Sequence, residues 1–278
     1  MVDLNHPDGL KWGKCSIGAK NEYEYGLYFQ WGSVDGTTGS NSIKIHTGTF
    51  VYNNINVNWR VIQNNAQRDY SWGTTPYCTN NAPKFSKYLG STDSPYKDPS
   101  ATDEDALKTT LDSIDDAAVQ RLGNGKRMPT ATEYLTLKNN TYWQWIDEGT
   151  EVRVKVVNSD GTVVSTPIKY PAGYFVFKVK DNSHKGKRNV PIISSQYDYN
   201  DYIQPTADVH IFFPASGYAN GTLVDSKGSR GYYSSSSLYS ESPGSHNFLD
   251  FAISSVSPIT SESEGRKLGC CIRAVSSN

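Results

Sequence analysis

The apolar residues of this chain occur in short runs, and this feature constrains its fold most strongly. Ile211-Phe212-Phe213 is among the most apolar stretches, and Pro214 ends it. No run approaches the ~18 apolar residues that a membrane-spanning helix requires, so no membrane insertion is expected. Residues 57–61 and 152–156 instead alternate between apolar and polar side chains. Because successive side chains of a strand point to opposite faces, this alternation predicts short strands.

Two segments carry helix signals. The first has apolar residues three or four positions apart, namely Leu107, Leu111, Ile114, Ala118 and Leu122. This stripe predicts one helix that begins after its cap Thr102 and ends at Gly123. A second helix is predicted to begin at the capping box of Thr130 and Glu133 and to run to residues 139–140. Two helices among many short strands predict an α+β fold.

Other segments predict strands or loops. A hairpin turn is expected at Asn158-Ser159-Asp160-Gly161, between two valine-rich segments. Residues 71–100 are dense in Gly, Pro, Ser, Asn and Thr, which predicts a long irregular loop. The remaining strand predictions are 43–45, 49–52, 174–177, 210–213, 248–257 and 268–275.

The charge balance and the aromatic residues narrow the function classes. Lys and Arg number 27 against 28 Asp and Glu, a formal net charge of −1. This argues against nonspecific binding of nucleic acid or membrane surfaces, which requires a basic excess. Tyr contributes 19 of the aromatic residues, against 9 Phe and 6 Trp. A chain rich in Tyr, Ser, Asn and Gly is typical of adaptable binding surfaces and β scaffolds.

The residues after Met1 include neither a basic start nor an apolar segment. We therefore expect either that an export signal has been removed or that the protein leaves the cell another way, for example inside a virion. The expected location is the cell surface, the extracellular space or a phage virion.

The cysteines do not indicate a metal site. Cys15, Cys78, Cys270 and Cys271 contain no C-x-x-C pair, so structural zinc is not expected. On a strand, Cys270 and Cys271 would point to opposite faces, so at most one of them could easily reach Cys15. A disulfide between the chain's two ends and buried free thiols both remain open.

Catalytic and metal-binding patterns are likewise missing from the sequence. The five histidines have no ligand spacing, and His210 is interpreted as a core or edge residue. Residues 234–237 lack the G-x-S-x-G pattern of a nucleophile elbow. The acidic groups at 103–105 and 115–116 are interpreted as a helix first turn and a solvated face. We therefore predict no catalytic residue, no cofactor and no metal ligand.

Four blocks of the chain, together with its C-terminal residues, form one ordered pattern. The first spans residues 2–32 and includes Gly9-Leu10-Lys11-Trp12, Ile17-Gly18-Ala19 and Glu24-Tyr25-Gly26. The others are Lys126-Arg127-Met128-Pro129-Thr130 with Glu133, then Phe212-Phe213-Pro214-Ala215-Ser216-Gly217-Tyr218, and Gly228-Ser229-Arg230-Gly231-Tyr232-Tyr233-Ser234-Ser235-Ser236. The C-terminal residues Arg266, Gly269 and Ile272-Arg273-Ala274-Val275 complete the pattern. Together these segments resemble the Fibrobacter succinogenes major paralogous domain family of Bacteroidetes and their phages.

This resemblance implies a single C-type-lectin-like domain over residues 1–278, with insertions at about 40–100 and 150–208. It also implies that the N- and C-terminal strands pair, that two helices flank the short antiparallel sheets, and that a long irregular loop region carries the ligand site. Two positions depart from the family pattern. Ser234 stands where a Trp is usual, which implies different packing under the binding loop. Ala274 stands where a Cys is usual, which argues against a family disulfide from Cys15.

The candidate ligand-binding residues lie within the segment 216–275. Leu249, Phe251 and Ile253 are expected to face the core, and the residues alternating with them are expected to face out. The resemblance places changeable positions at Arg230, Tyr232, Leu238, Asn247, Asp250, Ala252, Ser255, Ser257, Ser263 and Lys267. The candidate set is completed by Tyr218, Asn220, Ser234 and Tyr239.

The expected function is non-enzymatic ligand binding, as in adhesion or receptor recognition at a bacterial surface or phage tail tip. The expected partner is a cell-surface protein or a carbohydrate. Some relatives are variable proteins of diversity-generating retroelements, so residues 216–275 are a candidate hypervariable region. Two alternatives are an enzyme of the formylglycine-generating type and a passive envelope or virion structural module.

Overall fold

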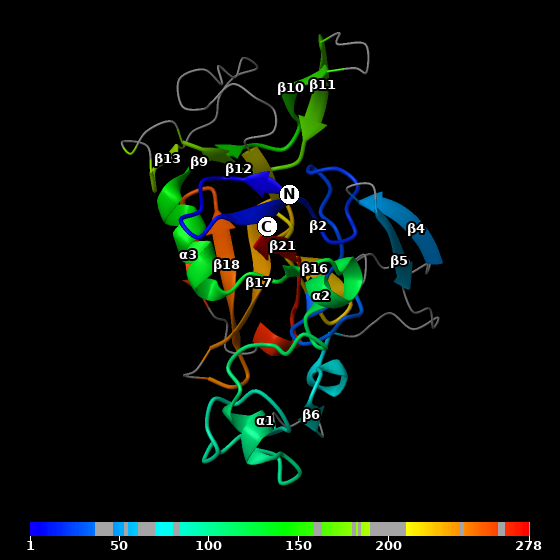
Figure 1. Cartoon of the computed structure of the whole chain (residues 1–278), viewed down its shortest axis with the longest axis vertical. Helices are drawn as coiled ribbons and strands as arrows, with labels where there is room; N and C mark the ends of the chain where they lie inside the picture. The colour runs from blue at the N-terminus through cyan, green and yellow to red at the C-terminus, as the bar shows by residue number, and fades with distance from the viewer. Residues whose placement is uncertain are drawn as a thin grey trace.

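Small, mostly antiparallel sheets dominate the secondary structure of the residues that the computed structural model describes, and three short helices accompany them (Figure 1). The fold is therefore α+β with β structure dominant. The structure describes residues 1–36, 47–52, 55–60, 70–79, 84–157, 163–179, 182, 185–189, 210–239, 242–260 and 265–277. The predicted strand at 43–45 and the predicted hairpin turn at 158–161 lie outside these residues. No helix in the described ranges is long and apolar enough to cross a membrane.

One sheet joins the two ends of the chain. Its strand order is β1 (Val2–Asp3), β2 (Leu10–Ser16), β21 (Arg273–Ser277) and β8 (Lys126–Arg127). Strands β2 and β21 are antiparallel, with Trp12 opposite Val275, and both side chains are completely buried. The N- and C-terminal ends consequently lie close together (Figure 1). The expected pairing of the terminal strands is confirmed.

A second sheet has the order β13 (Arg188–Asn189), β9 (Thr141–Ile146), β12 (Gly173–Lys178) and β14 (His210–Pro214). Three of its four strands, β9, β12 and β14, are buried on both faces. Along β9, Trp143 and Trp145 belong to one core cluster, whereas Tyr142 and Ile146 belong to another. Burial on both sides explains why these strands are continuously apolar rather than alternating.

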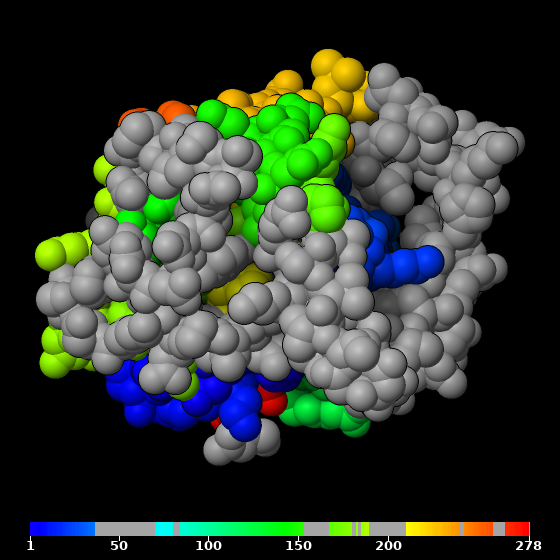
Figure 2. Space-filling view, turned by 90° about the horizontal axis from the view of Figure 1, so that it is seen from above, coloured from blue at the N-terminus to red at the C-terminus, as the bar shows by residue number. Residues whose placement is uncertain are grey.

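The predicted valine-rich hairpin is confirmed in its strands, β10 (Thr150–Val157) and β11 (Val163–Tyr170). It projects from one end of the molecule (Figure 1). Figure 2 looks down on that end, with green residues of this part of the chain on the viewed face and N-terminal residues (blue) along one rim. Two smaller hairpins are β4 (Thr47–Tyr52) with β5 (Ile55–Arg60), and β6 (Cys78–Thr79) with β7 (Lys84–Phe85).

Two further sheets come mainly from the C-terminal third. One has the order β17 (Arg230–Leu238), β18 (His246–Ala252) and β19 (Ser255–Thr260). The other has the order β16 (Leu223–Asp225), β15 (Tyr218–Asn220), β20 (Gly269–Cys270) and β3 (Phe29–Gln30). These two sheets carry most of the candidate site.

The prediction of one helix from Thr102 to Gly123 is wrong. The structure has two short helices, α1 (Asp103–Leu107) and α2 (Ala117–Leu122), capped by Thr102 and ended by Gly123 as expected. Between them the backbone of Leu111 donates to Ser236 O at 3.0 Å, and Thr109 O accepts from Leu238 N at 2.8 Å. Pairing with β17 therefore replaces helical hydrogen bonds in this segment. Two members of the predicted apolar stripe, Leu107 and Ile114, are exposed as a result.

The second predicted helix is confirmed as α3 (Ala131–Asn140). Its capping box is complete, because Thr130 Oγ1 accepts from Glu133 N at 3.2 Å and Glu133 Oε2 accepts from Thr130 N at 2.8 Å. Arg127 also donates to the Glu133 carboxylate, with Nη1–Oε2 at 2.8 Å. This ion pair fixes the start of the helix next to β8.

All four cysteines are free thiols, so the disulfide alternative is wrong. Cys271 is fully buried, and its Sγ donates to Tyr25 O at 3.1 Å. Burial raises the pKa of Cys271 to about 12, so this thiol stays protonated. The loop predicted at 71–100 is largely irregular, with the 3-10 turn Trp72–Thr74 and two-residue strands in its described part.

The interpretation of His210 as a core residue is confirmed. The side chain is buried, and its Nε2 lies 3.2 Å from Glu22 Oε1, which also accepts from the Tyr170 hydroxyl at 2.6 Å. Although burial opposes ionisation, the charge and hydrogen bond of His210 hold the pKa of Glu22 below its ordinary value. The pair ties the loop after β2 to strands β11 and β14.

Candidate ligand-binding face

Strand pairing brings several candidate residues onto one side of the β17–β18–β19 sheet. Residues directly opposite in an antiparallel pair point to the same side. Arg230 lies opposite Ala252, which lies opposite Ser255, and Tyr232 lies opposite Asp250, which lies opposite Ser257. These residues form the Arg230 face: Arg230, Tyr232, Asp250, Ala252, Ser255 and Ser257.

The other side of the same sheet faces the main core. Leu249 and Phe251 are buried there, as predicted from the alternation along β18. Ile253 was expected to face the core as well, and this is wrong. It is 40% exposed, because the chain turns between β18 and β19 at residues 253–254.

An ion pair forms the centre of the Arg230 face. The guanidinium of Arg230 donates from Nε to Asp250 Oδ1 at 3.3 Å and from Nη2 to Asp250 Oδ2. It also lies 5.1 Å from the ring centroid of Tyr232. The Tyr232 and Tyr218 rings form a T-shaped pair with their centroids 4.8 Å apart. The Asp250 side chain is 9% exposed and that of Arg230 is 41% exposed. A buried carboxylate thus fixes the orientation of a partly exposed guanidinium.

The expectation that this whole face points outward is wrong. Tyr232 packs with Phe248, Leu268 and Cys270 in a buried cluster, and Tyr218 packs against that cluster. Strands β15 and β20 therefore cover part of the face, so that only 2% of Tyr232 and 6% of Asp250 are exposed. The sheet that contains β15 and β20 is the physical reason for this burial, because it supplies the apolar cover.

The candidates at the far end of β17 are also buried. Ser234 Oγ lies 3.0 Å from His246 Nε2, and both side chains are inaccessible. Leu238 belongs to the core cluster of Trp31, and its carbonyl accepts from Asn247 Nδ2 at 2.8 Å. The expectation that Leu238 and Asn247 face outward is therefore wrong. These contacts stabilise the sheet end.

The remaining candidates differ in accessibility. Asn220 and Ser255 are exposed. Ser263 lies outside the described residues. Lys267 follows β19 in a 3-10 turn (Gly265–Lys267), and its carbonyl accepts from Gln30 Nε2 at 3.0 Å. The half-buried candidates are Tyr218, Arg230, Tyr239, Ala252, Ser257 and Lys267.

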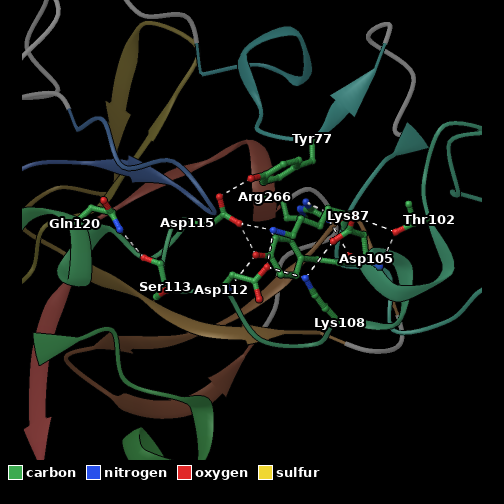
Figure 3. A network of polar contacts seen from close by, with 11 residues as sticks. Tyr77, Lys87, Thr102, Asp105, Lys108, Asp112, Ser113, Asp115, Gln120 and Arg266 are labelled. Atoms are coloured by element: carbon green, nitrogen blue, oxygen red, sulfur yellow. Dashed lines mark hydrogen bonds and ion pairs between the residues drawn. The ribbon is translucent and has the colours of Figure 1, made fainter. Parts of the chain in front are cut away.

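A second constellation, which the sequence interpretation missed, surrounds Lys87 (Figure 3). Lys87 Nζ lies 2.6 Å from Asp112 Oδ2 and 2.8 Å from Asp115 Oδ2. The hydroxyls of Tyr77 and Tyr88 both donate to the Asp115 carboxylate, the latter at 2.5 Å. These residues form the Lys87 network: Tyr77, Lys87, Tyr88, Lys108, Asp112 and Asp115.

The interpretation of residues 115–116 as a solvated acidic face is therefore wrong. Asp115 is buried in the Lys87 network, and Asp116 is buried as the cap of α2. Asp116 Oδ1 accepts from Ala118 N at 2.8 Å, and its Oδ2 accepts from Met128 N at 2.9 Å. Burial raises the pKa of Asp116 despite these hydrogen bonds.

Arg266 connects the Lys87 network to the C-terminal third. Its Nη1 donates to Tyr88 O and Pro243 O, each at 3.1 Å. The guanidinium lies over the rings of Trp31 and Phe85, at 4.9 Å and 4.1 Å from their centroids. A fully buried cation thus joins the loop around residues 84–116 to the body of the protein.

The charge states in the Lys87 network suit a structural role. Although burial lowers it, hydrogen bonds to Asp112 and Asp115 raise the pKa of Lys87 overall. Burial and the hydrogen bond to Asp115 raise the pKa of Tyr77 to about 12. The lysine therefore stays cationic and the phenol stays protonated, which suits neither a nucleophile nor a general base. Among the described residues no cluster of His, Cys, Asp and Glu could hold a metal ion.

No protein-family model, curated protein or solved structure matches the chain.

Proposed function

We propose that the protein is a non-enzymatic ligand-binding module with a C-type-lectin-like fold, acting in adhesion or receptor recognition at a bacterial surface or phage tail tip. The observation that carries this proposal is the Arg230–Asp250 pair, at the partly open end of a sheet face beside Tyr218 and the exposed Ser255. The pairing of β2 with β21 and the irregular, network-held loop at 84–116 support the fold assignment.

The chemistry of the pair suits recognition of polar groups. The Asp250 carboxylate already fixes the plane of the Arg230 guanidinium. The side chain therefore loses little further conformational freedom when a ligand binds, and the entropic cost of binding is small. The Arg230 guanidinium also lies over the Tyr232 ring, and Arg and Tyr are both enriched in interface hot spots. Carbohydrate hydroxyls and polar groups of a surface protein are both suitable acceptors. We propose that the ligand is either a carbohydrate or a cell-surface protein.

Screening of a glycan array and of purified surface proteins tests the proposal. For a ligand found this way, Arg230→Gln is expected to weaken binding about 30-fold, the value of a typical Arg hot spot of ~2 kcal/mol. Ser255→Trp is expected to block access without touching the core. Lys169→Gln is the matched control, because Lys169 lies on the β10–β11 hairpin and not on the Arg230 face, and its exposed side chain pairs with Glu151 at 4.0 Å.

Folding of each variant is checked by its thermal midpoint. Equal binding by Arg230→Gln, Ser255→Trp and Lys169→Gln would contradict the proposed site. Empty screens would contradict the proposed function and favour the structural-module alternative.

We also propose that any diversification by a retroelement concentrates on the accessible candidates. Substitution at Ser255, Ser257 and Lys267 leaves the buried cluster intact, whereas substitution at Tyr232 or Asp250 removes packing or an ion-pair partner. A near-copy of codons 216–275 that differs only at adenines would support diversification. Absence of such a copy and of a reverse transcriptase gene nearby would contradict it.

A further inference from the structure

Two Asn-Gly pairs occur in the chain, Asn124-Gly125 and Asn220-Gly221. In such a pair the backbone nitrogen of Gly can attack the side-chain carbonyl carbon of Asn, because Gly has no Cβ to block the approach. The reaction requires a backbone nitrogen that is accessible and a local backbone that can move. The two pairs differ in both respects.

Asn124-Gly125 lies in an exposed turn between α2 and β8, and both residues are exposed. Three successive residues have positive φ: Gly123 at 54°, Asn124 at 52° and Gly125 at 69°. A Cβ built on Gly123 or Gly125 would meet nothing within 4 Å, so the turn is surrounded by open space. Gly125 N–H donates no hydrogen bond to any described residue. The attacking nitrogen is thus unhindered.

Asn220-Gly221 is also at the surface, but its backbone is paired. Asn220 lies opposite Leu223 in the β15–β16 hairpin. Gly221 N donates to Tyr70 O at 3.1 Å, and Tyr70 N donates to Gly221 O at 3.0 Å. Both hydrogen bonds must open before Gly221 N can turn toward the Asn220 side chain. Local opening of paired backbone is costly, so this pair is protected.

We propose that Asn124 is a site of spontaneous deamidation in the folded protein. Gly125 N attacks Asn124 Cγ, the bond from Cγ to the side-chain nitrogen breaks, and ammonia leaves with the proton of Gly125 N. One water molecule then opens the resulting cyclic imide at either carbonyl, giving aspartate or isoaspartate. The net reaction consumes one water and releases one ammonia, without an oxidant, a reductant or an enzyme.

The product changes the turn in two ways. A carboxylate replaces a neutral amide beyond the C-terminal end of α2, where the helix dipole disfavours negative charge. Isoaspartate also lengthens the backbone within the turn that positions Met128 N against the buried Asp116 carboxylate. The modification therefore loosens the connection between α2 and β8.

The folded, intact chain is incubated in mildly alkaline buffer, and samples taken over time are digested and analysed by peptide mass spectrometry to test this proposal. The peptide containing Asn124 is expected to gain one mass unit at least about tenfold faster than the peptide containing Asn220, because only the latter requires local opening. In denaturant the two rates are expected to converge. Asn124→Gln, whose longer side chain forms the cyclic imide poorly, is expected to abolish the gain in the 122–126 peptide.

The proposal would be overturned if the two sites react at equal rates in the folded protein or if Asn220 reacts faster. It would also be overturned if Asn124 in the folded protein gains no mass within the time that it needs to react in the denatured chain. Methyl transfer by an isoaspartyl methyltransferase identifies the isoaspartate product. Its confinement to the Asn124 peptide is expected, and labelling of the Asn220 peptide alone would overturn the assignment.

Discussion

Replacement of Lys87 by Met is expected to destabilise the protein through the Lys87 network. The Lys87 side chain is 12% exposed and sits between Asp112, which is 35% exposed, and Asp115, which is 7% exposed. Removal of one partner of a buried ion pair costs about 3–5 kcal/mol, because the other charge stays buried without compensation. Two phenol hydroxyls still donate to Asp115, and Lys108 still contacts Asp112 at 2.9 Å.

These remaining contacts reduce the expected loss to about 2–3 kcal/mol in the free energy of unfolding. Urea denaturation followed by tryptophan fluorescence measures this loss. Lys97→Met is the matched control, because Lys97 pairs with Asp103, whose side chain is 74% exposed. Such a surface pair contributes about 1 kcal/mol or less.

The double variant Lys87→Met with Asp115→Asn separates the two contributions. It removes the stranded charge together with its partner, so it is expected to be more stable than Lys87→Met alone. The reasoning is refuted if Lys87→Met and Lys97→Met lose the same stability, or if the double variant is less stable than the single one.

Two further predictions concern His246 and Gly217. Burial, assisted by Arg266, lowers the pKa of His246 to about 3. As the pH falls below about 6.5, His246 binds a proton only in the unfolded chain. The free energy of unfolding therefore falls by about 2 kcal/mol between pH 7 and pH 5. His246→Gln is expected to remove that part of the pH dependence in urea titrations, and an unchanged pH slope would contradict this. Gly217→Ala is expected to cost about 3 kcal/mol or more in thermal melts, because φ is +62° and the new Cβ would lie 2.0 Å from Asp225 O. Gly9→Ala, with φ of +71° and open space around it, is the control and is expected to cost about 1 kcal/mol; equal losses would contradict the steric argument.

Local signals in the sequence predicted two helix starts and the helix end at Gly123 correctly, but not the end of α1 or the start of α2. The caps at Thr102 and Thr130 depend on side chains within three residues of the helix start, and Gly123 depends on its own backbone conformation. The interior between Thr102 and Gly123 could not be predicted this way. Its backbone pairs with β17, more than a hundred residues later in the chain, and that contact outweighs the local apolar periodicity.

The candidate site was predicted only in part for a related reason. Alternation along β18 identified which residues share a face, and Leu249 and Phe251 lie where it placed them. It could not indicate that β15 and β20 cover the opposite face, because that depends on packing between two sheets. The Lys87 network has no local pattern either, since its members come from separate loops between residues 77 and 115.

The position of β21 has a consequence for synthesis on the ribosome. This strand, formed by Arg273–Ser277, lies between β2 and β8 rather than at an edge of its sheet. Strand β2 emerges more than two hundred residues before its partner β21. The sheet therefore closes late, and contacts so distant in sequence form slowly. A chain truncated before residue 273 would leave β2 and β8 with unpaired edges, which favours aggregation.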